Sequence, residues 1–324
     1  MSSNCPFILI PVGKDYIWGG NRLRTEYGKA FIDLDPLAET WECSTHPEGE
    51  SLVGSGVFKG NKLSTVLKEH PQFLGKRYYC SNGQLPFLIK FIDAKQDLSV
   101  QVHPNDQYAN EYECGQLGKT EMWYVLDADI GASLVYGVNR VMSTGDLKEA
   151  VNQGTLMNYL NKVSVKAGDA FYIEAGTIHA LGKGVLVAEI QETSNLTYRL
   201  YDYDRVDKDG KKRTLHLEKA LAVANLIPCE KKASLMKVRR YMPGSYLEEI
   251  IKCTYFTVCR CIIKKSLKFT SNFESFRCLV VIEGNLKLHT EEFLDLRKGM
   301  TCFIPAGCES FEVIGIGACL IVSY

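Results

Sequence analysis

The stretch GDAFYIEAGTIH, residues 168–179, decides the fold class, because a similar stretch, GMTCFIPAGCES, follows at residues 299–310. Both copies run from a glycine through an apolar segment to Ile-x-Ala-Gly, and each then reaches a defined position eleven residues after its first glycine. Glycines at both ends of a short apolar segment indicate a strand between two tight turns. The repeat therefore predicts two related β-barrels. Only the first copy ends in histidine, His179, whereas the second ends in Ser310.

Short β-rich segments also dominate the rest of the chain. They lie at residues 86–93, 97–103, 121–128, 170–173, 185–191, 278–283, 301–304 and 319–324. Many are bounded by Gly, Asn, Asp or Pro, which is typical of a sandwich or barrel and not of alternating βαβ units. Helical periodicity is limited to residues 146–160 and 217–226. We expect a mainly β protein, with two barrels of the jelly-roll type and a few short helices.

The length of 324 residues exceeds what one hydrophobic core usually supports, which favours two domains. The second helical segment leads into Pro228 and the polar residues 230–232, which we interpret as the linker. The first domain should then cover residues 1–230, with helical insertions, and the second residues 235–324. Because Ser310 is a poor replacement for a histidine ligand, the second domain should be a degenerate barrel without metal.

The amino-acid composition indicates which classes of binding partner and which cellular compartment to expect. The 38 basic residues balance the 38 acidic ones, which argues against a nucleic-acid or membrane partner, although a few local lysines and arginines can still bind a small anion. The first twenty residues have neither a basic segment nor a long apolar run, so we expect no signal peptide or membrane span there. The twelve cysteines are scattered and lack CxxC spacing, so we interpret them as reduced thiols of a cytoplasmic protein.

A candidate metal site emerges from four residues. Gln101 and His103 are two apart in a predicted strand and so share a face, while Glu121 lies in the next one. With His179 they offer two imidazoles, a carboxylate and an amide oxygen, which suit zinc first and leave a position open for water or substrate. A lone strand histidine is more often structural, but here two of only six fall at motif positions that a barrel brings together. The others, which we interpret as surface or structural residues, are His46, His70, His216 and His289.

These motifs together resemble type I mannose-6-phosphate isomerases of the cupin superfamily, in particular the shorter bacterial form. The similar segments are IWGG at 17–20, ETWE at 39–42, PFLIK at 86–90, QVHPN at 101–105, GKTEMW at 118–123, GTIHA at 176–180 and QETSNLTYR at 191–199. In order, they cover roughly the first 225 residues. One departure is Glu174, which stands where the cupin turn usually has proline.

The resemblance implies cupin-like barrels and one zinc ion per chain, held by Gln101, His103, Glu121 and His179. It also implies that Arg199 is catalytic. The activity it implies is aldose–ketose isomerisation between mannose 6-phosphate and fructose 6-phosphate, by proton transfer through an enediol. The partner is then a small sugar phosphate, and the sequence leaves the oligomeric state open.

Three further residues are candidates for handling the substrate. Glu189 lies in the strand after His179 and alternates in register with Gln191, which makes it our acid/base candidate. Lys90 and Lys119 are candidates for orienting the substrate or holding its phosphate. The alternative without a catalytic role is that Glu189 is a carboxylate in a structural ion pair and that the two lysines are solvated strand residues.

Two rival functions stay open on the residues alone. Two histidines and one carboxylate also describe the iron site of a cupin oxygenase, although the Gln-x-His pair and the nearby basic residues favour the isomerase. A non-catalytic sugar-binding cupin is the other rival, and it has no need of Lys119 and Arg199.

Overall fold

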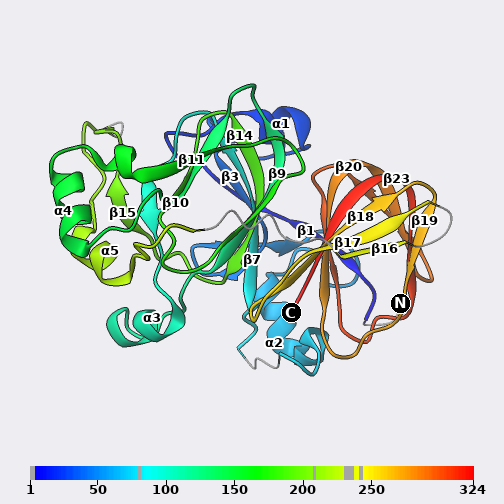
Figure 1. Ribbon diagram of the computed structural model, residues 1–324. Helices are drawn as coiled ribbons and strands as arrows, with labels where there is room; N and C mark the ends of the chain where they lie inside the picture. Colours follow the sequence, from blue (N-terminus) through cyan, green and yellow to red (C-terminus); the bar gives the residue numbers. More distant parts are fainter. Residues whose placement is uncertain (1–3, 79–81, 207–208, 230–236, 241–243) are drawn as a thin grey trace. The chain divides into compact units, whose positions relative to one another are not determined.

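The computed structural model describes residues 4–78, 82–206, 209–229, 237–240 and 244–324, and it is mainly β, as expected (Figure 1). The chain forms two compact units. Unit 1 comprises Met1–Lys14, Asn21–Phe91 and Ser234–Tyr324, and unit 2 comprises Asp15–Gly20 and Ile92–Ala233. The expected linker, residues 230–232, lies outside the described residues.

The division differs from the expected one, because most of residues 1–91 group with the C-terminal segment. The physical reason is strand pairing: β1 (Phe7–Ile10) pairs with β22 (Thr301–Ile304) on one side and with β6 (Leu52–Val53) on the other. Phe7, which is buried, also stacks on Phe303 with 5.2 Å between ring centroids. Early and late parts of the chain thus share one sheet.

Unit 1 is built on a large antiparallel sheet in the order β16-β17-β18-β23-β20-β22-β1-β6, with β19 beside β23 and β21 beside β20. Two long strands, β20 (Arg277–His289) and β23 (Phe311–Ser323), pair along their length, and alternate residues such as Leu279, Val281 and Val313 form its core. The remaining elements of this sheet are β16 (Lys237–Arg240), β17 (Tyr246–Lys252), β18 (Thr257–Ile263), β19 (Ser266–Phe269) and β21 (Phe293–Arg297).

The other elements of unit 1 come from its early segment. They are β2 (Val12–Lys14), α1 (Arg22–Glu26), β3 (Glu39–Cys43), β4 (Thr45–His46), β5 (Gly49–Glu50), α2 (Leu63–Glu69) and the 3-10 helix η1 (Pro71–Leu74). Strand β7 (Phe87–Ala94) straddles the division, with its first five residues in unit 1 and Ile92–Ala94 in unit 2.

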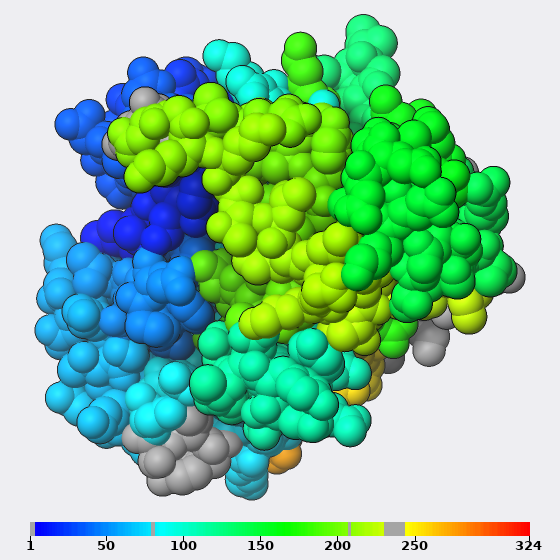
Figure 2. Space-filling model, turned by 90° about the vertical axis from the view of Figure 1, so that its left-hand side faces the viewer, coloured from blue at the N-terminus to red at the C-terminus, as the bar shows by residue number. Residues whose placement is uncertain are grey.

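Unit 2 contains two sheets. One has the order β11-β10-β13-β8-β15, and the other has the order β12-β9-β14, continuing to β7. The strands are β8 (Val100–Val102), β9 (Glu121–Ala128), β10 (Ser133–Val138), β11 (Leu160–Ser164), β12 (Ala170–Ile173), β13 (His179–Leu181), β14 (Val185–Glu192) and β15 (Tyr198–Tyr201). The helices are α3 (Asp106–Tyr112), α4 (Thr144–Asn152), the 3-10 helix η2 (Leu156–Tyr159) and α5 (Leu217–Val223). Figure 2 shows the yellow-green segment after residue 200 at the surface beside the green of α4.

One face of the five-stranded sheet of unit 2 packs in an apolar cluster. Val100, Val102 and Leu200 pack in one buried cluster with Leu147 of α4 and Ala220 of α5, and Figure 1 shows both helices beside this sheet. Because side chains alternate along a strand, the residues between them point to the opposite face. That face carries the candidate site. No helix in the described part of the chain is long and apolar enough to cross a membrane.

Candidate metal centre and active site

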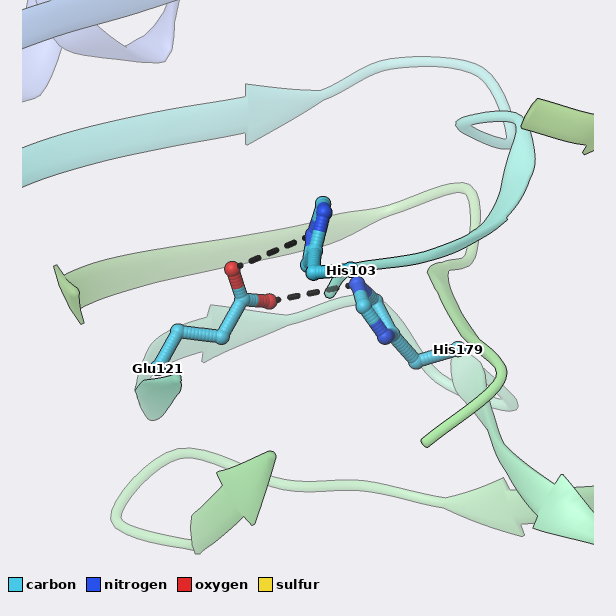
Figure 3. Close-up of side chains that lie close together, drawn as sticks. All are labelled: His103, Glu121 and His179. Atoms are coloured by element: carbon cyan, nitrogen blue, oxygen red, sulfur yellow. Dashed lines mark ion pairs between the residues drawn. The ribbon is translucent and has the colours of Figure 1, made fainter. Parts of the chain in front are cut away.

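The structure brings His103, Glu121 and His179 together in unit 2 (Figure 3). The Nε2 atom of His103 lies 3.5 Å from Oε2 of Glu121, and Nε2 of His179 lies 3.2 Å from its Oε1. All three side chains are buried, and their candidate ligand atoms lie within 4.8 Å of one another. His103 directly follows β8, while Glu121 and His179 are the first residues of β9 and β13. The prediction that these residues converge is therefore confirmed.

The hydrogen bonding of His179 prepares its Nε2 atom for a cation. Its Nδ1 atom lies 2.8 Å from the carbonyl oxygen of Thr177, which can only accept, so Nδ1 carries the proton. Burial lowers the pKa of His179 to about 4, which keeps the ring neutral at physiological pH. The lone pair of Nε2 then faces a carboxylate oxygen of Glu121, and two facing acceptors suit a cation between them. A carbonyl on the far nitrogen is also the usual orienting contact of a metal-bound histidine.

Lys119 places a charged group beside the cluster. It is buried, and its Nζ atom lies 3.1 Å from Oε2 of Glu121. The chemistry of the donor set, with neutral imidazole, carboxylate and only oxygen and nitrogen atoms, fits a divalent ion such as zinc. The ammonium group of Lys119 lies beside this carboxylate. It is therefore placed to bind an anionic or hydroxyl oxygen of a ligand next to the cluster.

Strand register places Gln101 and Arg199 in one row with His179. Gln101 in β8 is directly opposite His179 in β13 on one side and Arg199 in β15 on the other. Residues that pair directly across neighbouring strands project from the same face of a sheet. The amide nitrogen of Gln101 lies 3.3 Å from Nε2 of His179, so the orientation shown turns nitrogen and not oxygen toward that ring.

Arg199 is anchored at two of its three nitrogens. Its Nε donates to Oγ of Ser99 at 3.2 Å, and its Nη1 donates to the carbonyl of Thr214 at 2.9 Å. Burial lowers its pKa, and the neighbouring Arg213 adds to this effect, yet the guanidinium stays charged because its ordinary pKa is so high. In the described part of the chain, no hydrogen bond uses Nη2 of Arg199. That group is able to bind an oxygen of a ligand.

Glu189 and Trp123 form a polar pair on the facing sheet. The two residues are opposite each other in β14 and β9, and Nε1 of Trp123 donates to Oε2 of Glu189 at 2.8 Å. The Trp123 ring also lies edge-on to His179, with 5.3 Å between centroids. Glu189 is thus a buried carboxylate, held by an indole that itself touches the metal cluster.

Lys90 belongs to unit 1, unlike the other predicted site residues. It is buried, with its Nζ atom 3.8 Å from Oε2 of Glu39 and 4.8 Å from the centroid of the Trp41 ring. Both partners come from the ETWE segment. Of the predicted site residues, Gln101, His103, Lys119, Glu121, His179, Glu189 and Arg199 share unit 2.

Gln191 is a polar residue of this region that the sequence analysis did not single out. It lies opposite Glu121 in strand register, is fully buried, and donates its amide hydrogens to the carbonyls of Glu192 and Ser194. Among the residues that the structure describes, its Oε1 atom is a buried acceptor with no hydrogen-bond partner. Such an acceptor suits a hydroxyl donor. The signal in the sequence was its alternation with Glu189 on one strand face.

Comparison with known families gives two matches. Residues 7–127 match the family described as phosphomannose isomerase type I, catalytic domain. Residues 247–324 match the family described as mannose-6-phosphate isomerase, cupin domain. The similarity thus extends beyond residue 225, where the resemblance in the sequence analysis ended.

Individual proteins agree with the family matches. The mannose-6-phosphate isomerase ManA of Bacillus subtilis is 36% identical over 317 residues, covering 98% of each chain. The mannose-6-phosphate isomerase of Streptococcus mutans is 38% identical over 300 residues, covering 92% of each.

Solved structures agree as well. The crystal structure of the mannose 6-phosphate isomerase from Bacillus subtilis, 36% identical in sequence, superposes with a TM-score of 0.92 over 98% of this chain and 99% of that one. A phosphomannose isomerase variant from Salmonella typhimurium, only 20% identical, shares the fold with a TM-score of 0.76 over 98% of both chains. The sequence similarity spans nearly the whole length of the chain and of its bacterial relatives, and the fold agrees over the same length. The chain therefore belongs to the type I mannose-6-phosphate isomerase family.

Proposed function

We propose that the protein is a zinc-dependent aldose–ketose isomerase that interconverts mannose 6-phosphate and fructose 6-phosphate. The observation that carries the proposal is the buried cluster of His103, Glu121 and His179 in a member of this family. A neutral imidazole whose lone pair faces a carboxylate offers the kind of donor atoms that bind a metal ion.

One zinc ion per chain would be held by His103, Glu121, His179 and the amide oxygen of Gln101. Coordination by Gln101 requires its amide oxygen to stand where the nitrogen now faces His179. When bound, zinc acts as a Lewis acid that polarises the sugar carbonyl and stabilises charge developing on its oxygen. The carbonyl of Thr177 would hold the His179 ring in the tautomer that ligation needs.

Glu189 is the proposed acid/base and Arg199 the proposed electrostatic catalyst. Isomerisation moves a proton between adjacent carbons of the open-chain sugar through an enediol, and a buried carboxylate held by an indole is a suitable proton carrier. Arg199 keeps a fixed positive charge and a donor group for the oxygen that becomes negative in the transition state.

The two lysines are proposed to bind the sugar phosphate. Lys119, beside the carboxylate of Glu121, is placed to hold a substrate oxygen close to the metal. For Lys90, the support is the resemblance of the PFLIK segment together with its burial against Trp41. Both ammonium groups are shielded from water, which strengthens their attraction for a phosphate.

For the architecture, we propose that the sheets form two cupin-like barrels of the jelly-roll type. The second, formed mainly by residues 235–324, would be degenerate and hold no metal. We also propose that the protein acts in the cytoplasm, in keeping with its many thiols.

The test is a measurement of metal content paired with a turnover assay. The expected result is one equivalent of zinc and conversion of mannose 6-phosphate to fructose 6-phosphate that a chelator abolishes and zinc restores. Bound iron with oxygen consumption would instead identify an oxygenase. Binding of the sugar phosphate without turnover would identify a non-catalytic sugar-binding protein.

A further inference from the structure

Asp202 lies just after β15, three residues beyond Arg199, and is almost completely buried. Its carboxylate accepts hydrogen bonds from two arginines. Nη2 of Arg205 donates to Oδ1 at 2.6 Å, while Arg213 forms a bidentate pair, with its Nε donating to Oδ2 at 2.7 Å and its Nη2 to Oδ1. Bidentate pairs of this kind fix the orientation of both partners.

The first arm of this cluster runs through Arg205 to the segment before β8. Nη1 of Arg205 donates to the backbone carbonyl of Asp97, two residues before Ser99. Ser99 supplies the hydroxyl that accepts the hydrogen bond from Nε of Arg199. Asp202 thus fixes one of the two anchors of Arg199 through a single intermediate side chain.

The second arm runs through Arg213. The next residue along the chain is Thr214, whose carbonyl accepts the hydrogen bond from Nη1 of Arg199 at 2.9 Å. Because Asp202 holds the Arg213 side chain at two nitrogens, it also fixes the backbone that carries this carbonyl. Both anchors of Arg199 therefore depend on the same carboxylate.

Charge and backbone geometry support a dedicated role. Arg199, Arg205 and Arg213 would repel one another, and Asp202 is the carboxylate that lies among them. The chain also turns sharply here, with Tyr203 and Asp204 both in the left-handed region at φ 56° and 53°. Consecutive non-glycine residues in that region store strain, which persists only where the surroundings impose it.

We propose that Asp202 is a positioning residue for Arg199, holding the Ser99 and Thr214 anchors so that the free Nη2 group of the guanidinium meets the substrate. The proposal rests on the proposed function of Arg199 as an electrostatic catalyst in the isomerase. It assigns Asp202 no contact with the substrate.

The test is a double-mutant cycle on the full chain. Asp202→Asn should lower kcat about 10- to 100-fold, the cost typical of losing a supporting partner of an active-site group, while bound zinc stays at one equivalent. In the Arg199→Ala background, the same change should lower kcat by less than about 2-fold, because the residue it positions is gone. The matched control is Asp204→Asn, which removes an exposed carboxylate paired with Lys212 and should leave kcat unchanged.

Equal losses of kcat in both backgrounds would overturn the proposal, because the effect of a merely structural change adds to the effect of Arg199→Ala. A crystal structure of Asp202→Asn supplies a readout independent of turnover: displacement of Arg199 from Ser99 and Thr214 is expected, and an unmoved guanidinium would overturn the proposal. If Asp202→Asn does not fold, Arg205→Met and Arg213→Met each release one arm and should each lower kcat by part of that loss, and no loss in either would count against the proposal. A wild-type protein without turnover refutes the proposed isomerase, while the crystal structure still decides the positioning.

Discussion

The turn that ends in His179 in unit 2 and the turn that ends in Ser310 in unit 1 have the same backbone and different chemistry. Each is closed by the same pair of backbone hydrogen bonds. These are Gly168 N to Val125 O (2.8 Å) and Thr177 N to Glu174 O (3.0 Å) in unit 2, and Gly299 N to Val281 O (2.8 Å) and Cys308 N to Pro305 O (3.1 Å) in unit 1. The second glycine is left-handed in both, with φ 90° at Gly176 and 75° at Gly307. The backbone of the turn therefore does not by itself make a metal site.

Register shows what replaces each member of the metal cluster. Ile173 pairs with Glu121 in unit 2, and the equivalent Ile304 pairs with Arg277 in unit 1. A guanidinium thus stands at the position of the carboxylate. It lies 5.8 Å from the centroid of the Phe269 ring, which is a setting for a protein cation and not for a metal ion.

The histidine positions are replaced as well. The amide of Gly176 donates to the carbonyl of His103, and the amide of Gly307 donates to that of Asn272, which makes Asn272 the counterpart of His103. Ser310 accepts a hydrogen bond from the amide of Ser271 at 3.3 Å. The two turns thus share a backbone and differ in the three side chains that would hold a metal ion.

The largest effect should come from His179→Ala or His103→Ala. Each change deletes one of few ligands, so we expect the loss of bound zinc and a fall in kcat of about a thousandfold or more. The matched control is Ser310→Ala at the equivalent position of the second turn, which should change neither. Zinc measured by elemental analysis, alongside turnover, checks the result, and full zinc occupancy in either histidine variant would refute the ligand assignment.

A smaller effect is expected from Arg199→Ala, which leaves the metal ligands intact. The variant should keep its zinc and lose about 100- to 1000-fold in kcat, because the charge acts chiefly in the transition state. Steady-state kinetics separates the possibilities. If KM rises and kcat holds, Arg199 binds phosphate and is not an electrostatic catalyst.

Glu192, next to Gln191 in unit 2, should make folding stability depend on pH. Burial raises the pKa of Glu192 to about 8, and the nearby Asp106 carboxyl adds to the shift. Because the folded-state pKa lies above the unfolded value, this stabilisation is complete below about pH 4.5 and is lost as the pH rises through 8. The register counterpart in unit 1 is Tyr324, which has no carboxyl side chain.

We therefore expect the free energy of unfolding of the wild type to fall by about 2 kcal/mol more than that of Glu192→Gln between pH 6 and pH 9. Denaturant titrations at both pH values give this difference. Equal pH dependence in the two proteins would show that Glu192 is already ionised at pH 6.

The smallest effect is expected from Ser310→His, which restores only one member of the cluster in unit 1. Zinc content should stay at one equivalent, because Arg277 and Asn272 still occupy the other two positions. Native mass spectrometry of the full chain checks this result. A second equivalent of zinc would mean that the turn alone can assemble a site.

The sequence predicted the strands of both turns with their observed bounds, Ala170–Ile173 and Thr301–Ile304, because glycine-bounded apolar segments are local signals. It also predicted the convergence of His103, Glu121 and His179, since two of the six histidines lie in motifs that a barrel brings together. The helical signals at 146–160 and 217–226 correspond to α4 with η2 and to α5.

Features that depend on distant partners were not predictable. Helix α3 buries only Ala109 and is capped by the side chain of Asn105, so it has little apolar periodicity. The pairing of β1 with β22 joins residues almost 300 positions apart, and no local pattern encodes it. The contacts of Asp202 arise at a left-handed corner whose shape is set by the tertiary structure.

The pairing of β1 with β22 has a consequence for the order of folding during synthesis. Residues 7–10 leave the ribosome early, yet β22 emerges only once the chain has reached residue 304. Unit 2 ends at residue 233, so the cluster of His103, Glu121 and His179 can assemble before β22, the late partner of β1, has been synthesised. Until then one edge of β1 has no partner, and a nascent chain with an unpaired strand edge is open to aggregation. Co-translational folding should therefore begin in the middle of the chain, in unit 2. The first and last segments should complete their shared sheet only after β22 has been synthesised.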